Sequence, residues 1–158
     1  MPEIRKRIGQ ARHLGDDLPD VNVWLALAVM QHPHHDAAAA YWKNLTGCSV
    51  CFCRVTMLGL VRLLSQPKVM GEQALTLTQA IAAYHQFAVL PEVNLQPEPA
   101  DCGDQLQRFL STDTPARLLT DAYLAAFAVS ARMRMVTFDK HFDRFVGLDC
   151  LRLVAASH

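Results

Sequence analysis

The sequence predicts an α/β fold in which a mainly parallel central sheet carries helices on both faces. Short apolar runs alternate along the chain with longer segments of helical periodicity, which is the order of elements in such folds. Strands that alternate with helices imply a mainly parallel sheet that is covered on both faces. The 158 residues fit one domain, and 51% hydrophobic against 19% charged residues favours a packed core.

The first part of the chain contains two expected strands and two expected helices. A short strand ends near Asp20, and the apolar segment Val21–Met30 predicts a buried helix. The run His32-Pro33-His34-His35 interrupts it, and the alanine-rich segment Asp36–Leu45 predicts a second, amphipathic helix. Cys48–Cys53, which contains valine and phenylalanine after a glycine, predicts a buried strand.

The middle of the chain is expected to be mainly helical. Thr56 precedes a helix over Met57–Leu64, which must stop before the following proline. A further helix is expected over Gly71–Gln86, and the short apolar run Phe87–Leu90 after it could form a strand. The three prolines between Pro91 and Pro99 predict a loop.

The last part repeats the alternation of helix and strand. Ala100–Leu110 is expected to be helical, and Thr120 is a plausible N-cap for a long helix over Asp121–Arg132. The remaining expected elements are a strand over Met135–Phe138, a helical turn over Lys140–Phe145 and a final strand over Cys150–Val154.

The ends of the chain and its charge limit the classes of function. Residues 1–17 contain four Lys or Arg with weak periodicity, which predicts a basic tail ahead of a single domain over residues 18–158. Fifteen basic residues balance fifteen acidic ones, so no overall field would attract nucleic acid. An RNA substrate would therefore have to be held by a local basic patch or by a bound metal ion.

A cytoplasmic location without membrane contact is expected. The longest apolar runs are too short to cross a bilayer, and the N-terminus lacks the apolar core of a signal peptide. The five cysteines are expected to be reduced thiols, because an odd number leaves one unpaired and Cys48, Cys51 and Cys53 lie too close together for a disulfide framework.

Three aspartates are expected to meet at one edge of the sheet. Asp20 and Asp139 each follow a strand, at the edge where open α/β sheets bind ligands. The helix that begins at Asp121 runs away from that edge and the next strand returns to it, which brings Asp121 close to Asp139. Such a carboxylate cluster needs a divalent cation, and oxygen ligands suit Mg²⁺ or Mn²⁺. Taken singly, each aspartate could instead cap a helix.

Three segments resemble PIN domains of the VapC toxin type, and they occur in the order of that family. These are Leu18–Leu27, Thr120–Ala128 and Val136–Asp139. The likeness spans about Leu18 to Val154. The segments His32–Trp42 and Cys53–Arg62 are similar to a VapC subgroup.

The resemblance implies a three-layer PIN-like fold and a metal-dependent endoribonuclease, the toxin of a VapBC-type toxin–antitoxin system. By that likeness Asp20, Asp121 and Asp139 bind Mg²⁺ or Mn²⁺, while Asn22 and Thr137 support the first and the last of these acids through hydrogen bonds. The implied partners are an RNA substrate, a VapB-like antitoxin and a second copy of the chain in a homodimer.

Two positions depart from the family pattern. Many PIN domains carry a Glu where Gly59 stands, although the VapC subgroup often has glycine there. Asp143, about one turn after Asp139, could replace that carboxylate, but a solvent-facing position is the alternative. The segment Gly15-Asp16-Asp17, usually apolar in this family, leaves the start of the first strand open.

The departure at Gly59 supports an alternative function, a catalytically weak or inactive PIN-fold module that binds RNA or an antitoxin. A structure-specific DNA nuclease is a third reading, disfavoured by the small size and neutral charge.

Several other side chains could take part in a site. Arg62, one helical turn beyond Gly59, could contact RNA phosphate or form an ordinary ion pair, and Lys140 and His141 have the same two readings. The cysteines of Cys48–Cys53 do not have zinc-ligand spacing, so small buried side chains are the better interpretation. The histidines of residues 32–35 are interpreted as a solvated loop outside the site.

Overall fold

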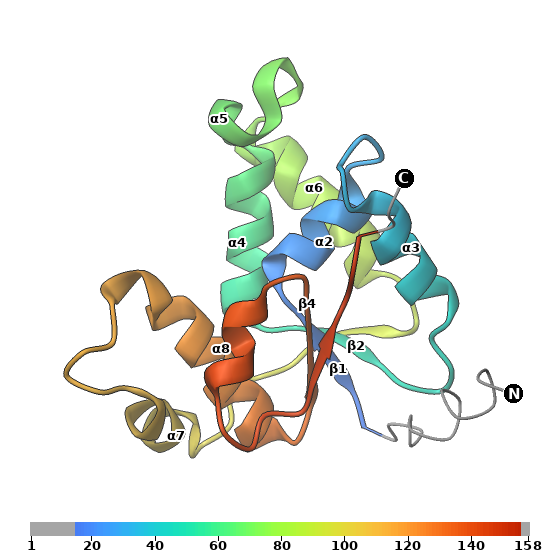
Figure 1. Cartoon of the computed structure of the whole chain (residues 1–158). Coiled ribbons are helices and arrows are strands. Elements are labelled where there is room, and N and C mark those ends of the chain that lie inside the picture. Colours follow the sequence, from blue (N-terminus) through green and yellow to red (C-terminus); the bar gives the residue numbers. More distant parts are fainter. Residues whose placement is uncertain (1–14, 156–158) are drawn as a thin grey trace, which may run out of the picture.

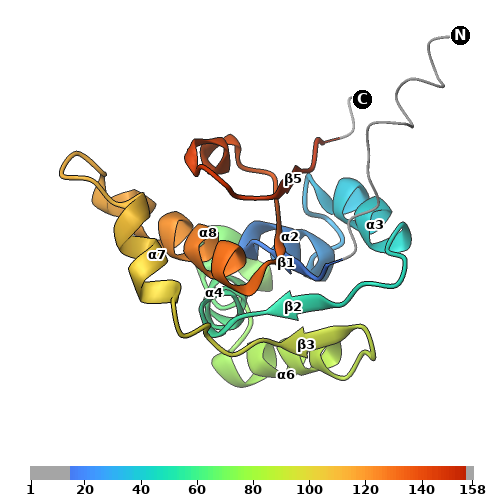
Figure 2. The ribbon, with the colours of Figure 1, turned by 90° about the horizontal axis from the view of Figure 1, so that it is seen from below.

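A five-stranded parallel sheet forms the centre of the computed structural model, which describes residues 15–155. The strands are β1 (Asp17–Pro19), β2 (Val50–Phe52), β3 (Val93–Leu95), β4 (Arg134–Thr137) and β5 (Cys150–Arg152). Their order across the sheet is β3-β2-β1-β4-β5, and all four pairings are parallel. Figure 2 shows the strands stacked in this order. The predicted α/β class is confirmed.

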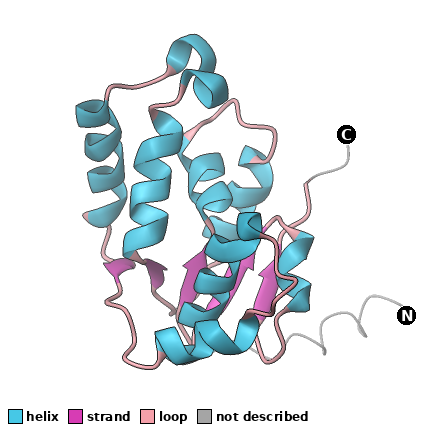
Figure 3. Ribbon diagram, turned by 90° about the vertical axis from the view of Figure 1, so that its left-hand side faces the viewer, coloured by secondary structure: helices cyan, strands magenta, loops and turns pink. Residues whose placement is uncertain are grey.

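Helices cover both faces of the sheet (Figures 1 and 3). The α-helices are α2 (Val21–Ala28), α3 (His35–Lys43), α4 (Arg54–Leu64), α5 (Pro67–Met70), α6 (Leu77–Ala88), α7 (Cys102–Phe109) and α8 (Leu119–Ala131). The 3₁₀ helices are η1 (Gly71–Gln73), η2 (Ala116–Leu118) and η3 (Lys140–Arg144).

Strand β2 shows how one short sequence serves two cores. Val50 and Phe52 pack into one buried cluster with Trp24, Leu60 and other side chains of α2, α4 and α6. Cys51, which lies between them, packs into the other cluster with α8 on the opposite face. Successive residues of a strand point to opposite faces, so a wholly apolar strand is required where both faces are covered.

The interpretation as small buried side chains is confirmed for Cys51 and Cys53, whereas Cys48 is only partly buried. All five cysteines are free, and Cys51 and Cys53 are buried in the same cluster as small apolar side chains.

The region between α6 and α7 differs from the expectation. Phe87–Leu90 is not a strand, because α6 continues to Ala88 and a turn follows. The strand lies instead at Val93–Leu95, inside the segment predicted to be a loop. Only Val93 is buried there, and the strand exists because its backbone pairs with β2. A pairing partner that is distant in sequence leaves no local pattern.

Several helix starts also differ. Helix α4 begins at Arg54, three residues before the predicted Met57, so Thr56 lies within it. The helix expected from Gly71 begins at Leu77, where Thr76 and Gln79 form a capping box, with the side chain of Thr76 accepting from the Gln79 N–H at 3.2 Å. Helix α8 begins at Leu119, so Thr120 lies within the helix and is not its N-cap. The 3₁₀ turn η2 leads directly into α8 and replaces a side-chain cap.

The first strand begins at Asp17, inside the segment expected to be a tail. The buried carboxylate of Asp17 accepts two hydrogen bonds from the Arg134 guanidinium, both at 2.9 Å, and one from the Tyr41 hydroxyl at 2.7 Å. An acid in this apolar position is stabilised by its partners in β4 and α3. The basic residues of the expected tail, 1–14, lie outside the described part of the chain.

Within residues 15–155, none of the helices combines the length and the hydrophobicity that a membrane span requires.

Candidate active site

The topology changes direction between β1 and β4. From β1 the chain proceeds to β2 and β3 on one side, whereas β4 leads to β5 on the other. In open α/β sheets the carboxyl ends of the two strands at such a switch point border the ligand crevice. Asp20 follows β1 directly and Asp139 follows β4 by two residues. The N–H of Asp20 donates to the Val136 carbonyl at 2.8 Å and so holds the two strand ends together.

Asp20 is the buried acid of the group. It is 7% exposed and acts as the N-cap of α2. One carboxylate oxygen accepts the Val21 N–H at 2.7 Å, and the other accepts the Thr137 hydroxyl at 3.0 Å. Both oxygens are thereby oriented by the backbone of α2 and by β4.

Asp121, Asp139 and His141 bring one ligand atom each to within 4.8 Å of one another. Asp121 lies in the first turn of α8, and Asp139 is the N-cap of η3, where its Oδ1 accepts the His141 N–H at 2.8 Å. The Nδ1 of His141 lies 3.1 Å from the same oxygen. Asp20 does not contribute a ligand atom to this group of three.

The charges of neighbouring acids raise the pKa values of Asp20 and Asp121. Burial is the main cause that raises the pKa of Asp20 to about 6, with smaller raising effects from the charges of Asp121 and Asp139 and lowering effects from the hydrogen bonds of Thr137 and Val21. Burial and the charge of Asp139 raise the pKa of Asp121, while His141 and Arg144 lower it. Negative charge is therefore concentrated here at a cost that a cation would offset.

Thr137 connects two of the acids. Its hydroxyl donates to Asp20 and accepts the backbone N–H of Asp139 at 3.0 Å. The resemblance implied support of Asp139 by Thr137, and the observed hydrogen bond has this form. The support expected from Asn22 is different, because among the described residues no hydrogen bond joins it to Asp20. The hydrogen bonds to Asp20 come instead from the Val21 N–H and the Thr137 hydroxyl, and the Asn22 Oδ1 is buried without a partner among the described residues.

Gly59 faces the start of α2. A Cβ built at this position would lie 2.8 Å from Val21 Cγ2, so α4 and α2 approach each other too closely for a side chain. At the position that is acidic in many PIN domains, the packing of α4 against α2 thus leaves no room for a side chain. Asp143 does not replace that acid, since it is exposed and lies 3.5 Å from Arg152 in an ion pair.

The remaining expected residue, Arg62, is exposed near the end of α4, and within the described region its guanidinium has no ion pair or hydrogen bond. Two residues near the acids were not selected from the sequence. His141 was considered only for RNA, although its position two residues after Asp139 was a usable signal. Arg144 is recognisable only from its proximity to Asp121.

The sequence of residues 18–148 matches the family model for the PIN domain. The chain belongs to the PIN-domain family. Ribonuclease VapC41 of Mycobacterium tuberculosis is 38% identical over 144 residues, which cover 87% of this chain and 98% of that protein. Ribonuclease VapC44 of the same organism is 31% identical over 131 residues, which cover 78% of this chain and 85% of that protein.

Solved PIN-domain structures share the fold. The crystal structure of Mycobacterium tuberculosis VapC20, described as a Sarcin-Ricin loop cleaving toxin, matches with a TM-score of 0.62 and 19% identity over 85% of this chain and 99% of that chain. The VapBC2 structure from Rickettsia felis, bound to a DNA fragment from their promoter, matches with a TM-score of 0.57 and 13% identity over 87% and 98% of the two chains. The predicted PIN-like architecture and the resemblance to VapC proteins are confirmed.

Proposed function

We propose that this chain is a metal-dependent endoribonuclease, the toxin of a VapBC-type toxin–antitoxin pair, which hydrolyses RNA phosphodiester bonds. The observation that carries the proposal is the convergence of Asp121, Asp139 and His141 beside the buried Asp20, at the switch point of the sheet. The PIN-domain match and the ribonuclease names of the relatives support the same reaction class.

The donor set fits a divalent cation. Two carboxylates and an imidazole are suitable ligands, and the predominance of oxygen favours Mg²⁺ or Mn²⁺. When bound, such a cation polarises a phosphodiester and lowers the pKa of a coordinated water.

Each side chain has a distinct role in this proposal. Asp121 and Asp139 bind the cation directly, and His141 adds a nitrogen ligand. Asp20 supplies the third negative charge, and each of its oxygens keeps a lone pair for the cation or its water. Thr137 fixes Asp20 relative to the backbone of Asp139. Arg62 is retained as a contact to RNA phosphate, since it is exposed and cationic.

The proposed partners follow from the same resemblance. They are an RNA substrate, a VapB-like antitoxin and a second copy of the chain, and the protein would act in the cytoplasm. The VapBC2 structure, bound to a DNA fragment from their promoter, supports a VapB-like antitoxin as partner.

The alternative of an inactive binding module rests on the missing acid at Gly59. The approach of His141 to Asp121 and Asp139 weighs against it, because a third ligand is available without that acid.

The test combines cleavage with metal binding. The purified chain should cut single-stranded RNA with Mg²⁺ or Mn²⁺ and lose this activity in EDTA, and Mn²⁺ should raise its melting temperature because it binds the folded state. Asp121→Asn should remove both effects, whereas Asp113→Asn, at an exposed loop position, should keep both. Unchanged cleavage by Asp121→Asn would refute the assignment. Manganese binding without cleavage of RNA would favour the inactive module, and preferential cleavage of DNA would favour the third reading.

A further inference from the structure

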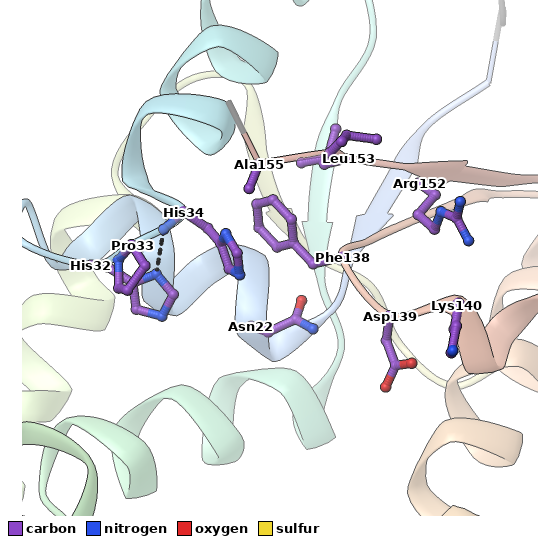
Figure 4. Close-up of a pocket in the computed structure, with 11 residues that line it drawn as sticks. Asn22, His32, Pro33, His34, Phe138, Asp139, Lys140, Arg152, Leu153 and Ala155 are labelled. Carbon is purple, nitrogen blue, oxygen red and sulfur yellow. Dashed lines mark hydrogen bonds between the residues drawn. The ribbon is translucent and has the colours of Figure 1, made fainter. Parts of the chain in front are cut away.

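A pocket of about 820 Å³ lies directly beside Asp139. Figure 4 shows that side chains from the start of α2, the α2–α3 loop, the β4–η3 junction and the end of β5 surround it. The residues that carry the argument are Asn22, His32, His34, Phe138, Lys140 and Arg152. Its volume falls in the range of pockets that hold a small ligand.

One wall of the pocket is aromatic. The rings of His34 and Phe138 are stacked with their centroids 4.5 Å apart and their planes inclined by 21°. Phe138 lies between Thr137, which orients Asp20, and Asp139, which belongs to the acidic group. A flat π-surface is thus fixed next to the proposed metal site.

The loop that carries His34 is held in place. The His35 ring donates from Nδ1 to the Ala26 carbonyl at 2.8 Å, which joins the start of α3 to α2. The His34 N–H donates to His32 Nδ1 at 3.1 Å, and the His32 N–H donates to the Val29 carbonyl at 2.9 Å. A preorganised wall loses little entropy when a ligand binds to it.

Polar and cationic groups complete the pocket. Lys140 is exposed beside Asp139, and Arg152 is 48% exposed and forms an ion pair with Asp143 at 3.5 Å. In Figure 4 the amide of Asn22 lies between Phe138 and Asp139, and its Oδ1 has no hydrogen-bond partner. An amide at this place can donate to or accept from the edge of a base.

We propose that this pocket binds one nucleotide of the RNA. This nucleotide is next to the phosphate that lies at Asp121 and Asp139. Its base extends the His34–Phe138 stack near Asn22, and its own phosphate pairs with Lys140 and Arg152. Proteins that bind single-stranded RNA combine stacking on aromatic rings with cations along the backbone, and both are present here. The inference rests on the proposed function for the class of its ligand. It adds the loop histidines to the substrate-binding surface.

The experiment measures RNA binding without cleavage. A fluorescein-labelled single-stranded RNA of twelve nucleotides is titrated with the full chain in EDTA, and affinity is read from anisotropy. Phe138→Leu keeps apolar volume but removes the π-surface, and should weaken binding about ten-fold. Lys140→Ala should weaken it about three-fold and reduce the slope of log affinity against log salt by about 0.7. Lys43→Ala, at the other end of α3 from His35, should bind as the unmodified chain does.

A second measurement does not depend on the stability of the variants. RNA carrying 5-iodouridine is irradiated with the unmodified chain, and mass spectrometry should find the cross-link on Phe138 or His34. Cross-links confined to other segments, or unchanged affinity in both Phe138→Leu and Lys140→Ala, would overturn the inference and leave a protein partner as the occupant. RNA bound in the pocket but never cleaved would keep the inference and refute the proposed function. Cleavage of RNA together with unchanged RNA affinity in Phe138→Leu and Lys140→Ala would refute the inference and keep the proposed function.

Discussion

Thr137 shows how a single side chain can organise an acidic group. Its hydroxyl donates to Asp20 and accepts from the backbone of Asp139, so two acids that are 119 positions apart in the sequence share one fixed point. The burial of Asp20 costs free energy, because a buried carboxylate is destabilised unless its charge is compensated. Asp20 therefore affects both the stability of the folded chain and its proposed chemistry.

The raised pKa of Asp20 predicts a pH dependence of stability in the absence of metal. Below about pH 4 the carboxyl is protonated in both states. As the pH rises to about 6, the unfolded chain loses this proton while the folded chain keeps it, so the contribution of Asp20 to the free energy of unfolding falls by up to about 3 kcal/mol. Asp20→Asn should remove this decrease and be more stable than the unmodified chain at pH 7. Urea unfolding in EDTA at pH 4.5 and 7 measures the effect.

The matched control is Asp113→Asn, whose pH dependence should follow that of the unmodified chain. An Asp20→Asn variant that is less stable at pH 7 than at pH 4.5, by the same amount as the unmodified chain, would contradict the prediction.

Gly59 predicts an exception to helix propensity. Alanine in a helix is ordinarily about 1 kcal/mol more stable than glycine. Here the new Cβ would lie 2.8 Å from Val21 Cγ2, and we expect Gly59→Ala to lower the free energy of unfolding by about 1 kcal/mol or more. The double variant Val21→Ala/Gly59→Ala should recover much of the loss, since the clash is removed. Chemical denaturation of the four chains gives the coupling, and additive effects would refute the packing explanation.

At the scale of elements, α8 and β4 together position Asp121 and Asp139. Helix α8 carries Asp121 in its first turn, and β4 follows it and leads to Asp139. The reversal between them occurs at Arg132, which has φ 55° and caps the end of α8 in the left-handed conformation. Six residues of α8, from Ala122 to Ala128, are buried, so the position of Asp121 is set by the core.

Arg132 occupies a conformation that favours glycine. Its side chain is exposed, and a left-handed backbone costs an L-residue about 1 kcal/mol. Arg132→Gly should therefore raise the free energy of unfolding by about 0.5 kcal/mol after the larger entropy of the unfolded chain is included. Arg108→Gly, within α7, should lower it by about 1 kcal/mol. Urea unfolding curves measure both, and a less stable Arg132→Gly would contradict the prediction.

At the scale of the whole molecule, the net charge is zero, so binding of RNA would depend on local features of the surface. With no overall field, RNA would be held by the acidic group with its cation and by the pocket beside Asp139. Both lie at the switch point of the sheet.

Several large apolar side chains remain exposed on α4, α5 and α6, namely Leu58, Val69, Leu77 and Ile81.

The expected homodimer can be tested on the intact chain. The resemblance to VapC proteins predicts a homodimer, and the exposed apolar side chains of α4, α5 and α6 are candidates for its contact. Sedimentation velocity at micromolar concentration should give a mass about twice the 17.6 kDa of the chain. A monomer at all concentrations measured would refute the dimer, without affecting the assignment of the acidic group.

The sequence by itself determined the fold class and singled out three candidate acids. Apolar strands alternating with helices required a covered parallel sheet, and Asp20, Asp121 and Asp139 could be selected because each stands at a strand end or a helix start. The placement of β3 could not be predicted, because only its pairing with β2 makes Val93–Leu95 a strand.

Only the tertiary structure decided which side chains meet. His141 joins Asp121 and Asp139, Asp20 accepts a hydrogen bond from the hydroxyl of Thr137, and His34 of the α2–α3 loop stacks on Phe138. The physical reason is that local patterns record burial and backbone preference, whereas the distance between side chains far apart in sequence depends on the packing of every element between them.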